Sequence, residues 1–149
     1  METRIERPTL AEIEAAAGLL EGTVLPTPLV HFGDPHARPD TESGIWLKPE
    51  VHQRVGSFKI RGVYHAVARM DAAERARGIS TVSAGNTAQA LAWCGRHFGV
   101  EARSLMPDGA PQTKIDAVRA LGGTPVLVPV EEVFRFLPAG CKVVISATQ

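Results

Sequence analysis

Residues 79–106 decide the fold class and read ISTVSAGNTAQALAWCGRHFGVEARSLM. The short β-branched run Ile79–Ser83 predicts a strand, because branched side chains favour the pleated backbone. Thr87–Phe98 has the apolar spacing of a helix, and Gly99 follows where a helix commonly ends. Val100–Met106 predicts a second strand. A strand, a helix and a second strand together predict a parallel β-α-β unit with a right-handed crossover.

The same alternation continues toward the C-terminus. The further elements expected are a helix, a strand, a short helix and a fourth strand, at 111–121, 124–130, 131–137 and 142–147. An apolar helical stripe also precedes the unit and is expected to end by Gly78; its members are Phe58, Ile60, Val63, Val67 and Met70. Residues 56–149 are therefore expected to form a small α/β domain, an open parallel sheet with flanking helices.

Residues 1–55 follow a different pattern. Thr9 and Glu12 form a capping-box motif for a helix that should stop near Gly22. A turn-rich surface loop and a short strand are expected next, at 31–44 and 45–47. We expect residues 1–55 to be an N-terminal extension that packs against a second, larger domain.

Composition excludes several classes of function. The 149 residues contain 16 basic and 16 acidic side chains, so no excess charge favours a nucleic acid or an anionic membrane as partner. The two cysteines, Cys94 and Cys141, are too few and too far apart for a disulfide framework or a zinc cluster, and no metal site is expected. The N-terminus lacks the apolar core of a signal peptide, so a cytoplasmic location is expected.

The first candidate chemical motif is GSFKIRG, residues 56–62. Glycine and serine before an apolar stripe predict Ser57 as the N-cap of a helix. Lys59 then falls in the first turn, where the helix dipole disfavours a cation and favours the neutral amine that attacks an aldehyde. The alternative is an ordinary exposed lysine at a helix start.

The second motif is SAGNTAQ, residues 83–89, between a strand and a helix. Open α/β sheets bind ligands at this carboxyl edge. Free amides at the helix start suit a carboxylate or a phosphate, and Ser83, Asn86 and Thr87 offer side-chain contacts. The alternative is a routine turn in which Asn86 or Thr87 caps the helix.

The two motifs together resemble the fold-type II pyridoxal-phosphate (PLP) enzymes, and most closely the threonine/serine dehydratases (ammonia-lyases), a group that includes serine racemase. Short matches in the same order support the resemblance: Thr27-Pro28-Leu29, Leu47-Lys48-Pro49-Glu50, Met106-Pro107 and Lys114. It runs from about residue 9 to about residue 130.

The resemblance implies a lyase that converts L-threonine or L-serine into a 2-oxo acid and ammonia. Lys59 would hold pyridoxal 5'-phosphate as a Schiff base and act as the catalytic base. Phe58 would pack against the pyridine ring and Asn86 would bind the ring hydroxyl oxygen. The substrate carboxylate would be held by the loop residues Ser83, Gly85, Thr87 and Ala88.

Some residues depart from the family pattern. Thr87 stands where many dehydratases have histidine, and Ala84 replaces the serine that racemases use. The glycine-rich phosphate loop is not among these residues, and residues 138–149 do not match the family. We therefore expect an N-terminal fragment whose activity alone is doubtful, from a protein that is a homo-oligomer when complete. Threonine synthase, diaminopropionate ammonia-lyase and serine racemase stay open as activities, as does a non-catalytic α/β remnant.

Overall fold

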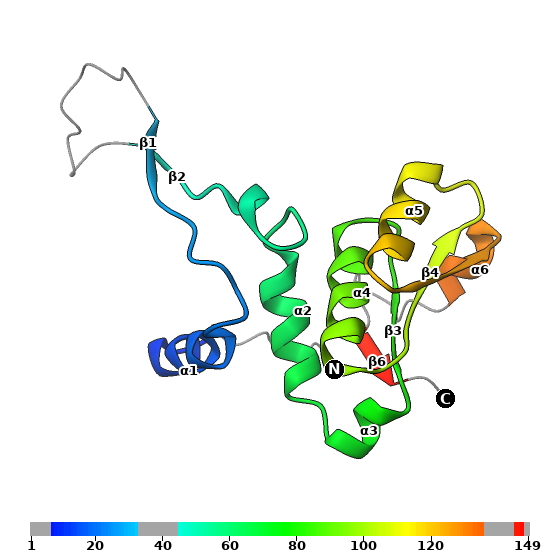
Figure 1. Cartoon of the computed structure of the whole chain (residues 1–149), viewed down its shortest axis with the longest axis horizontal. Coiled ribbons are helices and arrows are strands. Elements are labelled where there is room, and N and C mark those ends of the chain that lie inside the picture. The colour runs from blue at the N-terminus through cyan, green and yellow to red at the C-terminus, as the bar shows by residue number, and fades with distance from the viewer. Residues whose placement is uncertain (1–6, 33–44, 136–144, 148–149) are drawn as a thin grey trace.

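A computed structural model describes residues 7–32, 45–135 and 145–147. Its centre is a four-stranded sheet of strand order β5-β4-β3-β6. The strands are β3 (Ile79–Val82), β4 (Ala102–Pro107), β5 (Thr124–Val128) and β6 (Ile145–Ala147). The first three are parallel, which confirms the predicted β-α-β units. Figure 1 shows these strands between helices on two sides.

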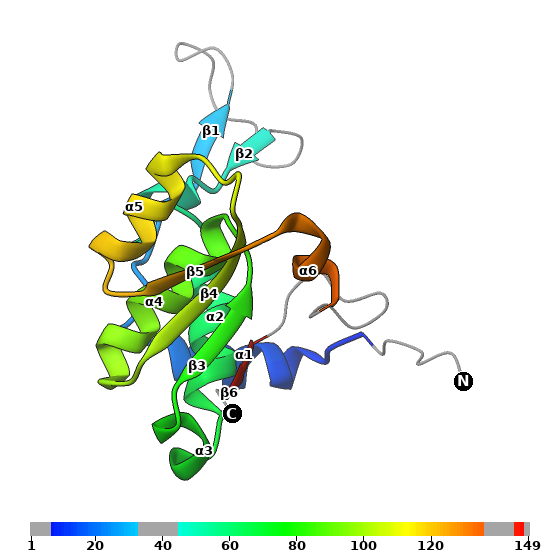
Figure 2. The same cartoon turned by 90° about the vertical axis from the view of Figure 1, so that its right-hand side faces the viewer.

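Helices α4 (Asn86–Phe98) and α5 (Gln112–Ala120) make the two crossovers. Helix α4 packs on β3 and β4, and α6 (Val130–Arg135) contacts β4 from the other side of the sheet (Figure 2). The predicted glycine stop at Gly99 is confirmed, and a second glycine ends the next helix. Gly99 ends α4 at φ 67°, and Gly122 follows α5 at φ 92°. Both backbones lie in the left-handed region that favours glycine.

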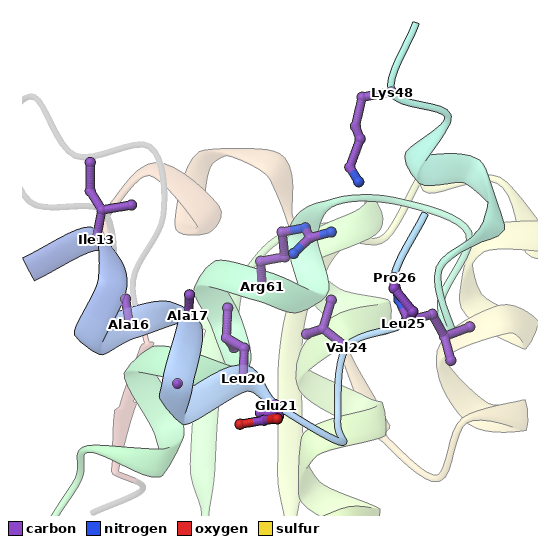
Figure 3. A pocket seen from close by; sticks show the side chains of 11 residues that line it. Ile13, Ala16, Ala17, Leu20, Glu21, Val24, Leu25, Pro26, Lys48 and Arg61 are labelled. Carbon is purple, nitrogen blue, oxygen red and sulfur yellow. The ribbon is translucent and has the colours of Figure 1, made fainter. Parts of the chain in front are cut away.

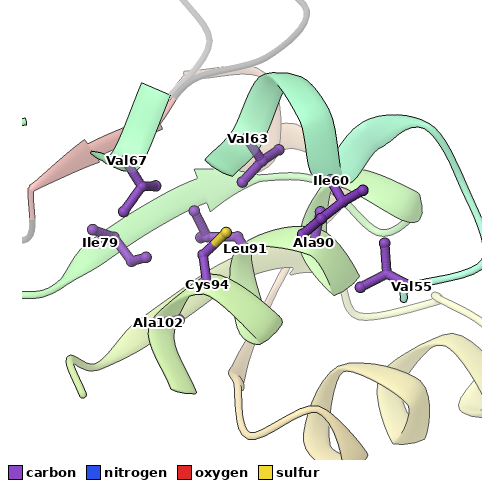
Figure 4. Packing of buried hydrophobic residues seen from close by; sticks show 9 residues of the cluster. All are labelled: Val55, Ile60, Val63, Val67, Ile79, Ala90, Leu91, Cys94 and Ala102. Atoms are coloured by element: carbon purple, nitrogen blue, oxygen red, sulfur yellow. The ribbon is translucent and has the colours of Figure 1, made fainter. Parts of the chain in front are cut away.

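The main core joins α2 (Lys59–Ala68), α4 and β3. Ile60, Val63 and Val67 form the buried face of α2. They pack with Leu91 and Cys94 of α4, and the cluster continues onto β3 (Figure 4). The apolar stripe that predicted the helix is thus the stripe that faces α4.

Three expectations about the elements are wrong. The single helix expected up to Gly78 is two, α2 and α3 (Ala72–Ala76), because Asp71 accepts hydrogen bonds from Ala73 N and Glu74 N and starts a new helix. Strand β6 runs antiparallel to β3, an arrangement that needs no crossover helix. Val30–Phe32 is strand β1, where a loop was expected at His31.

The N-terminal part contains α1 (Leu10–Leu20) and the antiparallel pair of β1 with β2 (Ile45–Leu47). The capping box of Thr9 and Glu12 is confirmed. Helix α1 buries none of its side chains. Figure 1 shows β1 and β2 extending away from the sheet. Most of the expected loop (33–44) and the start of the expected fourth strand (142–144) lie outside the described residues.

Candidate functional site

Lys59 is the first residue of α2, as the sequence predicts. The burial of Ile60 and Val63 against α4 fixes which side of the helix faces the core, and this leaves Lys59 half-buried. Its Nζ lies 4.9 Å from the ring centroid of Phe58. Phe58 itself is 57% exposed, so one large apolar ring beside the amine is free to contact another molecule.

Ser57 does not cap this helix, which corrects the sequence prediction. Phe58 occupies the cap position with helical angles and makes no side-chain cap bond. The Ser57 side chain is instead buried, and its hydroxyl oxygen has no hydrogen-bond partner in the described part of the chain. A buried hydroxyl without a partner costs about 1–3 kcal/mol.

Helix α4 begins at Asn86, and its N-cap is Gly85 with no side-chain cap bond. The alternative in which Asn86 or Thr87 caps this helix is therefore excluded. The Ser83 Oγ accepts a 3.2 Å hydrogen bond from Gly85 N, which tightens the turn. No heavy atom lies within 4 Å of the position a Gly85 Cβ would take, so a ligand can approach this backbone.

The remaining loop residues differ in accessibility. The Asn86 side chain is exposed, whereas Thr87 is 5% exposed. Ala88 is fully buried and packs with Met106 and Val118. Ala88 therefore offers no side-chain surface to a ligand. An uncapped helix start with free amides is a favourable site for an anionic group.

The two motifs lie at the same end of the molecule. Helices α2 and α4 pack side by side and both start at the end where β3 finishes, as Figures 1 and 2 show. A contact at the opposite end agrees with this direction, because the guanidinium carbon of Arg75, which follows α2, lies 4.5 Å from the ring centroid of Phe98 at the end of α4. The carboxyl edge of the sheet, the start of α2 and the start of α4 thus converge.

An ion pair that the sequence did not reveal lies behind the start of α2. Arg61 Nε and Nη2 donate to the two carboxylate oxygens of Glu50 at 2.7 and 2.8 Å. The hydroxyl of Thr27 also donates to Glu50, at 2.6 Å. These contacts, with Arg61 contributing most and burial opposing, lower the pKa of Glu50 to about 2. The only hint in the sequence was that Thr27 and Glu50 lie in segments resembling the family.

A separate open hollow of about 640 Å³ lies between α1 and α2 (Figure 3). Its walls are mostly apolar, from Ile13, Leu20 and Val24, with Lys48 and Arg61 at its edge. Lys59 and Asn86 do not line it. The hollow is therefore distinct from the end of the molecule where the two motifs converge.

Other kinds of site have no support among the described residues. Within 7–32, 45–135 and 145–147, no three His, Cys, Asp or Glu side chains are grouped as a metal site would require. No helix in these ranges has the length and apolar character needed to cross a membrane. Cys94 is a free thiol with no exposed surface, and burial raises its pKa to about 12. Cys141 lies outside the described residues.

Comparisons with known proteins agree with the family resemblance. Residues 20–139 match the family model described as pyridoxal-phosphate dependent enzyme. An L-threonine ammonia-lyase of Thermotoga maritima is 40% identical over 119 residues, 80% of this chain. Threonine deaminase isoform 2 of Solanum lycopersicum has a similar structure, with a TM-score of 0.64 and 32% identity over 82% of this chain. Serine racemase of Dictyostelium discoideum gives a TM-score of 0.71 and 26% identity over 85%.

The match covers only part of each relative. The chain spans 29% of the Thermotoga lyase, 36% of the tomato deaminase chain and 44% of the racemase chain. The family model, in contrast, covers most of the present chain, from residue 20 to residue 139. The chain belongs to the family of pyridoxal-phosphate dependent enzymes.

Proposed function

We propose that this chain carries the cofactor lysine and part of the substrate site of an ammonia-lyase that acts on L-threonine or L-serine. The observation that carries the proposal is the convergence of the Lys59 and Asn86 helix starts at the carboxyl edge of the sheet. Relatives named as an L-threonine ammonia-lyase and a threonine deaminase support this choice of reaction.

The residues at this end fit the cofactor. Phe58 offers an exposed ring face to a pyridine ring, and Lys59 offers an amine beside it. Asn86 offers an exposed amide. Pyridoxal phosphate, when bound, withdraws electrons from the Cα of an amino acid.

Each residue of the chain then has a defined task. Lys59 would attach the cofactor until the substrate amine takes its place. The freed Lys59 amine would then accept the proton from the substrate Cα and pass it to the β-hydroxyl, which departs as water. Asn86 would orient the cofactor ring and Phe58 would pack on it. The substrate carboxylate would be held by the loop that lacks a side-chain cap, through Ser83, Gly85, Thr87 and the Ala88 amide.

Ala84 favours elimination over racemisation. A racemase needs a second acid–base group on the face of the substrate opposite the lysine, and the alanine side chain has none to offer. The structural similarity to a serine racemase therefore concerns the scaffold, and we assign this chain to the elimination branch.

We also propose that residues 1–55 form an extension that covers a second, larger domain, and that residues 56–149 form the small domain. Large apolar side chains of the extension are exposed, far more than a surface in water normally carries. The most exposed are Leu10 at 70%, Val51 at 69%, Leu29 and Ile45 at 63% each, and Phe32 at 62%. We expect the complete protein to form homo-oligomers.

The experiment uses the full-length protein with pyridoxal phosphate. Borohydride reduction followed by peptide mapping should find the cofactor on Lys59, and threonine should yield 2-oxobutyrate. The variant Lys59→Ala should lose both, with an unchanged circular dichroism spectrum. Lys114→Ala, an exposed lysine of α5, is the matched control and should keep both. Label on Lys48 or Lys114 would contradict the assignment of Lys59, and the absence of any bound cofactor would favour a non-catalytic α/β module.

A further inference from the structure

We propose that Glu50 is a positioning residue for Lys59, acting through Arg61. Arg61 donates two parallel hydrogen bonds to the Glu50 carboxylate, and we call this ion pair the Glu50 fork. It would fix the first turn of α2, and so the direction in which the Lys59 amine projects. The inference deepens the proposed function, because its importance for the reaction rests on Lys59 being the cofactor lysine.

The contact is built as a rigid fork. Both carboxylate oxygens of Glu50 are used, one by Arg61 Nε and the other by Arg61 Nη2 together with the Thr27 hydroxyl. Two parallel charge-assisted hydrogen bonds fix direction as well as distance. The Glu50 side chain is 15% exposed, whereas both members of the Glu101–Arg103 pair are nearly half exposed. Solvent therefore competes much less for the Glu50 fork.

The first turn of α2 is held on its core side by the buried Ile60, but its exposed side has no other ion pair or cap among the described residues. No side chain caps it, and Gly56 with φ 69° precedes it by three residues. Lys59 and Arg61 are two residues apart on a helix of about 3.6 residues per turn, so they project from nearly opposite sides. The fork can therefore stop the turn from rotating without occupying the space of the Lys59 amine.

The other end of the fork is also anchored. Gln53 pairs with the backbone of Leu25, accepting from its N–H at 3.0 Å and donating to its carbonyl at 2.7 Å. Arg54 Nε donates to the carbonyl of Thr23 at 2.7 Å, and Lys48 donates to the carbonyl of Thr27. The segment that carries Glu50 is thus held to residues 23–27 by hydrogen bonds. Arg61 therefore pairs with a carboxylate whose own position is fixed.

The experiment measures the Lys59 amine directly. Trace acetylation of the full-length protein after the cofactor has been removed, followed by peptide mapping, gives the labelling rate of Lys59 relative to exposed Lys114 across a pH series. The variant Glu50→Gln keeps the side-chain shape but loses the charge. We expect it to change this relative rate on the order of two- to tenfold, as for residues coupled in one salt-bridge network. Glu101→Gln removes the same charge from an exposed pair and should leave the rate unchanged.

Two further variants separate positioning from general destabilisation. If Glu50 acts through Arg61, Arg61→Gln should change the relative labelling rate of Lys59 by the same factor as Glu50→Gln. The variant that carries both substitutions should show no further change in this rate. Thr27→Val removes only the hydroxyl contact and should give a smaller change in the same direction, which keeps the test available if Glu50→Gln fails to fold. Equal labelling of Lys59 in all these variants, or additive effects of the two fork variants, would overturn the inference. Acetylation needs no cofactor, so this outcome is independent of the borohydride mapping that tests Lys59 as the cofactor lysine.

Discussion

Lys59 and Asn86 are each the first residue of a helix, and their helices, α2 and α4, run in the same direction against each other. The shared core of Ile60, Val63 and Leu91 fixes this arrangement. Parallel packing brings two positive helix ends and two polar motifs to the same edge of the sheet. Residues 27 positions apart in sequence thereby become candidates for a single site.

The first prediction concerns Asn86 in the full-length protein with cofactor. Asn86→Ala should leave the cofactor on Lys59 but shift its visible absorption band, because the proposed amide contact is to an oxygen of the chromophore. Absorption spectra before and after borohydride mapping measure both effects. Gln89→Ala, three residues further along α4, is the control and should leave the band in place. An unchanged band in Asn86→Ala would remove Asn86 from the proposed site.

A second prediction tests the close packing of α4 on the sheet. A Cβ added at Gly95 would lie 2.5 Å from the Ala102 Cβ and 2.9 Å from the Val100 carbonyl oxygen. Gly95→Ala should therefore lower the free energy of unfolding by about 1–3 kcal/mol, since forced overpacking outweighs the better helix propensity. Thermal or urea unfolding measures this.

Gly62 of α2 provides the matched control. No heavy atom lies within 4 Å of its added Cβ, and it is also inside a helix. Gly62→Ala should raise stability by up to about 1 kcal/mol through helix propensity alone. If both alanine variants changed stability in the same direction, the space around Gly95 would not be what limits the side chain there.

A third prediction concerns the thiol of Cys94. Its pKa of about 12 and its lack of exposed surface keep it protonated and shielded at neutral pH. Iodoacetamide should modify Cys94 only when the chain unfolds, so labelling should rise together with the unfolding transition in urea. Peptide mapping distinguishes Cys94 from Cys141. Rapid modification of Cys94 in native protein would show that α2 and α4 separate readily.

Periodicity explains which features the sequence could predict. The apolar stripe of α2, the β-branched run of β3 and the glycines with positive φ each act within one element, and each prediction is confirmed. The placement of Lys59 at a helix start followed from the same local pattern.

Features that depend on distant partners could not be predicted. Nothing in Ile145–Ala147 indicates strand direction, so its antiparallel pairing with β3 was missed. Nothing local indicated that Glu50 pairs with Arg61, because the pair forms only when the chain turns at Gly56 between them. The Ser57 cap was wrong by one residue, which is the usual uncertainty of a helix boundary. The roles of Phe58, Lys59 and Asn86 stay predictions.

The last prediction concerns the pH dependence of stability, which the Glu50 fork should govern in acid. The Arg61 guanidinium and the Thr27 hydroxyl hold the folded-state pKa of Glu50 at about 2, below its ordinary value of 4.5. Between these pH values the unfolded chain binds a proton at Glu50 that the folded chain does not, so stability falls as the pH falls. The contribution of the fork is therefore complete above about pH 4.5 and lost as the pH falls through about 2.

The measurement is the free energy of unfolding of the wild type minus that of Glu50→Gln, followed from pH 6 downward. The difference should be about 1–3 kcal/mol near neutral pH, between the values for exposed and buried ion pairs. It should shrink steadily over the acidic window, whereas the difference for Glu101→Gln should stay small throughout because that pair is exposed. Other carboxylates titrate in the same window, but they do so in both proteins and cancel in the difference. A difference that is independent of pH would mean that Glu50 stabilises the fold by its shape alone, and its fork with Arg61 would then have no electrostatic role.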